Sequence, residues 1–120
     1  MIIRREQLSA FSAAMRQEFV QRSAQRLKSD FAAHLLRQNV PPDGLEDWVS
    51  RGVDAARKYG VVRDGDVSLY LDCMALLGAN FDRDRRWPWA GQILNRTDLD
   101  GEAKMDRIHD RLLFEPGVPR

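Results

Sequence analysis

Only a few side chains in this 120-residue chain have the chemistry for catalysis or metal binding. The two histidines, His34 and His109, fall on different predicted helices, and no His-x-x-x-His or Cys-x-x-Cys spacing offers the ligands that a structural zinc requires. Cys73, the single thiol, lies in the middle of a predicted helix without an obvious histidine partner. A cysteine in that setting is typically a small buried residue. The sequence therefore predicts no metal site and no thiol catalyst.

Acidic residues provide the next candidates. Residues 80–84, Asn-Phe-Asp-Arg-Asp, begin like a calcium-binding EF-hand loop, but Arg85 stands where that loop needs glycine and Gly91 where it needs a bidentate glutamate. Acidic pairs such as Glu46 and Asp47 are better explained as helix caps and dipole partners than as a general acid–base pair. No nucleophile elbow or phosphate-binding glycine loop is present. We therefore expect a protein that is not an enzyme and binds no cofactor.

The densest group of residues suited to binding lies between positions 81 and 89. Arginine and tryptophan together can contact nucleic acid, but the interleaved aspartates offset much of the positive field. The same residue types are frequent in the hot spots of protein–protein interfaces. The candidate partner-binding residues are Phe81, Asp82, Arg85, Arg86, Trp87, Pro88 and Trp89. The aromatic members of this set could equally fill the core, and composition does not separate the two roles.

The overall composition is that of a soluble globular protein. The chain is 43% hydrophobic and 31% charged, with 19 basic and 18 acidic residues and a net charge of +1. Near-neutrality argues against nucleic acid or an anionic membrane as a partner. One cysteine fits a reducing compartment, and Met1–Glu6 has no apolar signal region behind it, so we expect a cytoplasmic protein. The length suits one domain over residues 1–120.

The segments that must position these residues are all predicted to be helices. No segment alternates like a strand, so the predicted fold is all-α, a single-domain small bundle of about five helices. The first helical region, about residues 5–37, carries an apolar stripe that begins at Leu8, Phe11 and Met15. That stripe shifts by one residue at Val20, which predicts a break or bend near Phe19–Gln21.

The remaining helices are predicted from local start and stop signals. Asp43 with Glu46 resembles a capping box, glycines 60 and 78 follow apolar runs as C-terminal stops, and Trp87 precedes a proline suited to a first helical turn. The predicted helices begin at Asp43, at Asp64 or Asp66, at Pro88 and at Asp100, and the last ends near Leu113. Residues 1–4 and 115–120 are expected to be flexible ends.

The middle of the chain resembles a known family. The matching residues are Tyr59-Gly60-Val61, Asp66-Val67, Tyr70, Met74, Leu77-Gly78, Phe81-Asp82, Trp87-Pro88-Trp89-Ala90 and Ile93-Leu94. They resemble small helical proteins encoded in bacterial type VI secretion effector clusters, near the genes of the spike tip and the effector. The likeness covers about residues 5–95 and consists of caps, glycine stops and aromatic anchors, with no catalytic motif.

The resemblance implies an accessory role. The protein would be a non-enzymatic adaptor or co-chaperone that helps load an effector onto the secretion spike, and its partner would be an effector, its chaperone or a spike-tip protein. Some small proteins of such clusters are instead immunity proteins, so neutralisation of a toxin that acts in the cytoplasm is the alternative. A small helical module that binds nucleic acid is the third hypothesis.

Overall fold

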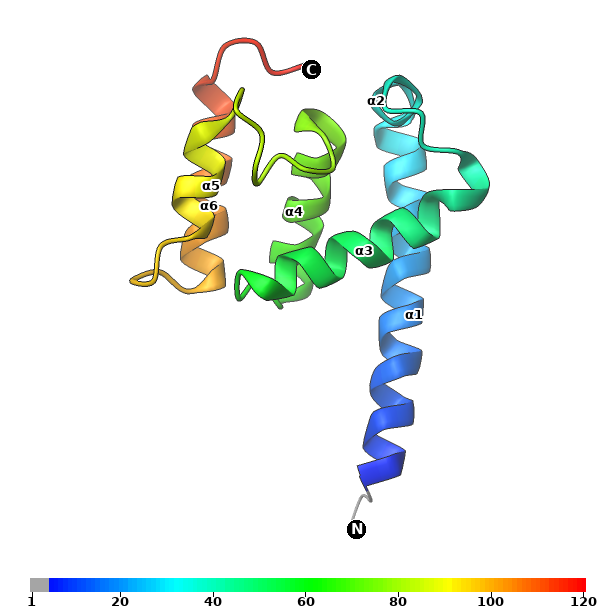
Figure 1. Ribbon diagram of the computed structural model, residues 1–120. Helices are drawn as coiled ribbons and strands as arrows, with labels where there is room; N and C mark the ends of the chain where they lie inside the picture. Colours follow the sequence, from blue (N-terminus) through cyan, green and yellow to red (C-terminus); the bar gives the residue numbers. More distant parts are fainter. Residues whose placement is uncertain (1–4) are drawn as a thin grey trace.

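The computed structural model describes the backbone of residues 5–120 and the side chains of residues 12–120. That part of the chain contains helices and no strand, so the all-α prediction is confirmed (Figure 1). Within residues 5–120 there are six α-helices, five of them with seven or more residues, and one 3-10 helix, in agreement with the predicted bundle of about five helices. The elements are α1 (Arg5–Asp30), α2 (Ala32–Arg37), η1 (Pro42–Gly44), α3 (Leu45–Lys58), α4 (Asp64–Leu77), α5 (Pro88–Leu94) and α6 (Gly101–Phe114).

The predicted break near Phe19–Gln21 is wrong. Helix α1 runs without interruption through these residues, and the chain leaves helical geometry only at Phe31, where φ is −128° and ψ is 28°. On the two sides of Val20 the helix has different partners, since Arg16 contacts α3 and Arg26 contacts α4. A straight helix has 3.6 residues per turn, so its buried positions drift around the axis as it passes from one packing partner to the next.

The predicted cap at Asp43 is also wrong. Residues Pro42–Gly44 form a 3-10 turn, and α3 begins at Leu45 with no side chain capping its first amides. The other boundary signals are confirmed. Gly60 and Gly78 have φ of 79° and 116°, a region that glycine enters without the steric cost of a Cβ atom. Trp87 precedes Pro88 at the start of α5. Asp100 caps α6 by accepting a hydrogen bond from the Ala103 amide at 2.9 Å.

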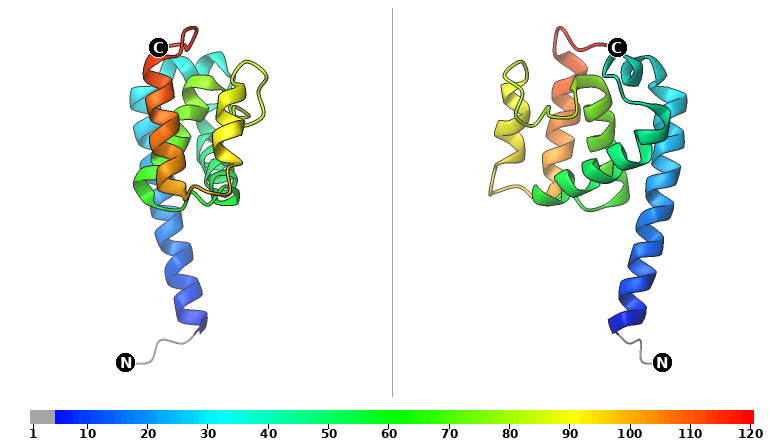
Figure 2. Two further views of the ribbon diagram at one scale, coloured as in Figure 1. Left: turned by 90° about the vertical axis from the view of Figure 1, so that its left-hand side faces the viewer. Right: turned by 45° about the vertical axis from the view of Figure 1, so that its right-hand side comes forward.

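The core gathers around α4. This helix packs against α1, α2, α3 and α6, and α5 in turn packs on α6 (Figure 2). Seven of its residues are buried, which explains why its sequence is apolar around most of its circumference. The fully buried large side chains of the core are Leu27, Val49, Val61, Tyr70, Leu71, Cys73, Phe81, Leu94, Met105 and Ile108.

The N-terminal part of α1 extends beyond the other helices as a single rod (Figures 1 and 2). The Cα radius of gyration is 15.3 Å, and the principal extents are 53 × 38 × 19 Å. A compact domain of this length has a radius of gyration of about 13–14 Å. The side chains of Leu8 and Phe11, which were predicted to begin the apolar stripe, lie outside the described residues, whereas Met15 is 55% exposed.

The C-terminal residues 115–120, expected to be flexible, fold back onto the bundle. Val118 is buried, the Arg120 guanidinium donates to the Leu112 carbonyl at 2.7 Å, and His34 Nε2 donates to the Pro119 carbonyl at 3.0 Å. These contacts join the end of the chain to α6 and to α2. The other predicted flexible end, residues 1–4, lies outside the described residues.

Candidate functional site

The candidate residues between positions 81 and 89 divide into an inner and an outer group. Phe81, Trp87 and Trp89 are buried. The Phe81 ring lies 4.9 Å from the Tyr70 ring between centroids, and Trp87 Nε1 donates to the Leu77 carbonyl at 3.3 Å. These three aromatic side chains anchor the loop and α5 to the core.

Asp82 belongs to the inner group as well. Its side chain is only 12% exposed, and its carboxylate accepts a 2.5 Å hydrogen bond from the Tyr59 hydroxyl at the end of α3. Partial burial, together with this hydrogen bond and the negative charge of Asp82, raises the pKa of Tyr59 to about 12. The pair therefore joins the loop to α3 through a hydrogen bond from the phenol to the carboxylate.

Loss of the Tyr59 hydroxyl is expected to weaken the fold. The Tyr59→Phe variant should lower the free energy of unfolding by about 1–2 kcal/mol, because it leaves a largely buried carboxylate without its donor. The folded-state pKa of Tyr59 lies above the usual value of about 10, so its stabilising effect is complete below pH 10 and is lost as pH rises through 12. Urea unfolding between pH 8 and 12 should show a shallower alkaline decline in the variant than in the wild type.

Tyr70→Phe is the matched control for this measurement. Among the described residues the buried Tyr70 hydroxyl has no hydrogen-bond partner, so its removal should change stability at pH 8 by less than about 0.5 kcal/mol. Equal losses in the two variants would show that the Tyr59–Asp82 hydrogen bond contributes nothing specific.

The outer group consists of Arg85, Arg86 and Pro88, which are exposed. Arg86 is held in place by Asp84: its Nη2 and Nε donate to the carboxylate at 2.8 and 3.2 Å, and its guanidinium carbon lies 5.7 Å from the centroid of the Trp87 ring. The Arg86 hydrogen bonds lower the pKa of Asp84. Of the predicted contact residues, only these three face solvent.

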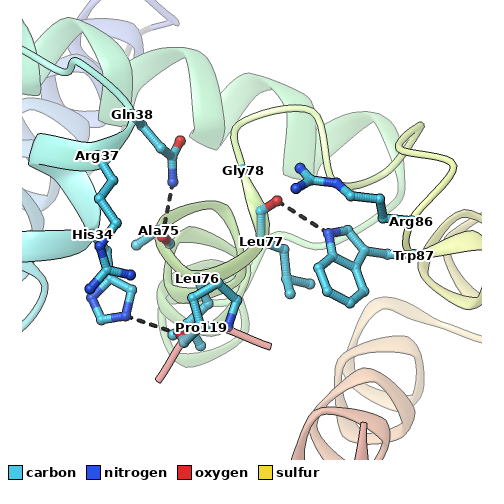
Figure 3. Close-up of a pocket in the computed structure, with 10 residues that line it drawn as sticks. All are labelled: His34, Arg37, Gln38, Ala75, Leu76, Leu77, Gly78, Arg86, Trp87 and Pro119. Carbon is cyan, nitrogen blue, oxygen red and sulfur yellow. Dashed lines mark hydrogen bonds between the residues drawn. The ribbon is translucent and has the colours of Figure 1, made fainter. Parts of the chain in front are cut away.

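A pocket of about 270 Å³ opens beside Arg86 and Trp87, at the C-terminal end of α4 (Figure 3). Figure 3 shows His34, Arg37 and Gln38 from the α2 region on one side, Arg86 and Trp87 on the other, and the last residues of α4 between them, with Pro119 at the base. The Gln38 amide donates to the carbonyls of Met74 and Ala75, both at 2.9 Å. Four separate segments of the chain therefore line the pocket, namely residues 34–38, 75–78, 86–87 and 119.

Of the residues that line this pocket, only Arg86 and Trp87 were predicted from the sequence as contact residues. His34 is half-buried and donates to the carbonyl of Pro119 in the C-terminal tail, a partner that nothing near it in the sequence indicates. Arg37 and Gln38 were not singled out, because a helix end followed by prolines carries no local sign of what packs against it.

The remaining candidates for chemistry are separated or buried. His109 is exposed on α6, away from His34 on α2. Cys73 is buried in α4, and burial raises the pKa of its thiol, which keeps it protonated. Among the described residues, no three His, Cys, Asp or Glu side chains come together as a metal-binding group. None of the helices within residues 5–120 combines the length and apolar character needed to cross a bilayer.

Comparison with known protein families, with curated proteins and with solved structures found no match.

Proposed function

We propose that the protein is a non-enzymatic accessory protein of type VI secretion, an adaptor or co-chaperone in effector loading that acts through protein–protein contacts. The observation that carries the proposal is the part of α1 that extends beyond the bundle (Figure 1). The family resemblance over residues 5–95 supplies the biological setting.

The first described side chains of α1 have little packing against the bundle. Residues 12–15 are exposed. In the next turn Arg16 donates to the Ser50 hydroxyl at 3.0 Å and pairs with Asp54 at 3.0 Å, and the half-buried Phe19 packs against the edge of the core. Burial in the core begins only at Val20. A short isolated helix is marginal in water, so a helix that continues past its own core gains stability by packing against a partner.

The first test is co-purification of the tagged full chain with the products of adjacent genes, under conditions in which secretion is active. We expect mass spectrometry to identify a spike-tip protein, an effector or the effector's chaperone. Met15→Arg, which places a charge on the exposed side of α1, should weaken recovery of that partner by about tenfold. Leu113→Arg is the matched control, since Leu113 has a similar exposure of 53% but lies on α6.

Deletion of the gene separates the adaptor from an immunity protein. Loss of an adaptor should abolish secretion of the effector or lower its level, without harm to the cell. If the protein alone rescued cells from a neighbouring toxin, and its deletion were lethal only with that toxin present, the adaptor proposal would be overturned in favour of immunity. Salt-sensitive binding to generic duplex DNA, with no protein partner recovered, would favour the nucleic-acid hypothesis.

A further inference from the structure

The pocket at the C-terminal end of α4 has a one-sided charge. Two of its ten lining residues, Arg37 and Arg86, are cationic, and none of the ten is a carboxylate. Such a pocket favours an anionic ligand, even though the chain as a whole is close to neutral.

Arg37 is the cation at this pocket that remains available. Eight arginines of the described residues form ion pairs with nearby carboxylates, Arg86 among them. For Arg37, which is exposed, no carboxylate of the described side chains lies within ion-pair distance. An exposed guanidinium keeps its five donors for a ligand, and it prefers a planar carboxylate or a phosphate.

The same pocket also presents hydrogen-bond acceptors. The last carbonyls of a helix lack intrahelical partners. In α4 the Met74 and Ala75 carbonyls accept from Gln38, and the Leu77 carbonyl accepts from Trp87. The Leu76 carbonyl accepts no hydrogen bond from the described residues, and Leu76 lines the pocket. A complementary ligand therefore carries both a negative charge and N–H donors.

A peptide with an acidic side chain has both features, whereas a phosphodiester backbone has charge but no donor. The negative end of the α4 dipole also disfavours a dense line of phosphates at this point. At about 270 Å³ the pocket is smaller than those that enclose cofactors, and a side chain with its adjoining backbone suits it better.

We infer that this pocket docks an acidic segment of a protein partner, with a carboxylate on Arg37 and backbone N–H groups facing the end of α4. The inference rests on the proposed function in one respect, that the partner is a protein. It places a second contact surface on the molecule, at the end of the bundle away from the free part of α1 (Figure 1).

The test is a titration of the ¹⁵N-labelled full chain with a glutamate-rich hexapeptide in low salt, in which the amide chemical shifts report binding. We expect the largest shifts at residues 34–38, 75–78, 86–87 and 120, the last because Pro119 itself has no amide N–H. Arg37→Glu should weaken binding by about tenfold. Arg57→Glu is the matched control, because Arg57 is also exposed and has no ion-pair partner among the described side chains, but lies on α3. Thermal unfolding of both variants checks that the fold is retained.

Three outcomes would overturn the inference: no binding of the peptide at millimolar concentration, shifts scattered over many arginines, or equal losses in the two variants. Tighter binding of a short duplex DNA to the same residues would assign the pocket to nucleic acid instead. Because the titration uses a synthetic peptide, its failure leaves the adaptor proposal standing. Conversely, failure to recover a type VI partner leaves the peptide result unchanged.

Discussion

The Phe81→Ala variant is expected to lose about 3–5 kcal/mol of unfolding free energy, the range for deleting a large aromatic side chain from a core. Phe81 has 0% of its surface exposed, and its ring packs on that of Tyr70. A small domain has only about 5–15 kcal/mol of stability in total, so this loss removes a large fraction of it and should lower the unfolding midpoint markedly. Urea denaturation followed by far-ultraviolet circular dichroism measures the loss.

Phe114→Ala provides the control for the same change of residue. Phe114 ends α6 and is 83% exposed, so its replacement should alter stability by less than about 0.5 kcal/mol. If Phe81→Ala were equally mild and yet abolished recovery of a protein partner, Phe81 would be a contact residue that becomes accessible in solution. The structure instead assigns it to the core, so we expect any loss of partner binding in this variant to follow from unfolding.

The Gly101→Ala variant is expected to lose about 2–3 kcal/mol, because α6 begins in direct contact with the backbone between α3 and α4. A Cβ atom at position 101 would overlap the Gly60 carbonyl oxygen and lie 2.9 Å from both the Gly60 carbonyl carbon and the Val61 Cα atom. Backbone atoms cannot move aside as a flexible side chain can. The junction is further held by Lys104, whose ammonium group donates to the Tyr59 carbonyl at 2.8 Å.

Gly65→Ala is the matched control, since Gly65 also lies in the first turn of a helix but has open space around the position of its Cβ atom. There alanine should stabilise the protein by about 0.5–1 kcal/mol, because it restricts the unfolded chain and favours helix. Thermal and urea unfolding of the two variants should therefore move in opposite directions. A stabilising effect of alanine at both positions would contradict the close approach of α6 to Gly60.

The predicted boundaries succeeded where a single residue type decides the backbone locally. Gly60 and Gly78 adopt positive φ, Pro88 occupies the first turn of α5, and Asp100 caps α6. They failed where the outcome depends on distant packing. The shift of the apolar stripe at Val20 predicted a break, but α1 continues as one helix through this position. Asp43 was predicted to cap the next helix, but it lies in the 3-10 turn Pro42–Gly44.

The candidate site shows the same division. Composition identified Phe81, Trp87 and Trp89 as binding-type residues but could not decide whether they face the core or solvent, because both settings favour aromatic side chains. Only the packing of the loop against α4 places them inside. The pocket at the end of α4 could not be predicted from the sequence for a further reason. Residues 34–38 and Pro119 come together only when the C-terminal tail folds back.

By itself, then, the sequence determined the helical class, most helix ends and the near balance of charge, since periodicity, caps and composition act over a few residues. The tertiary structure alone decided which aromatic residues are buried, where α1 runs free of the bundle, and that an arginine without a carboxylate partner among the described side chains, Arg37, lines the pocket at the end of α4. These features depend on which distant segments come into contact, and a local pattern carries no information about its distant neighbours.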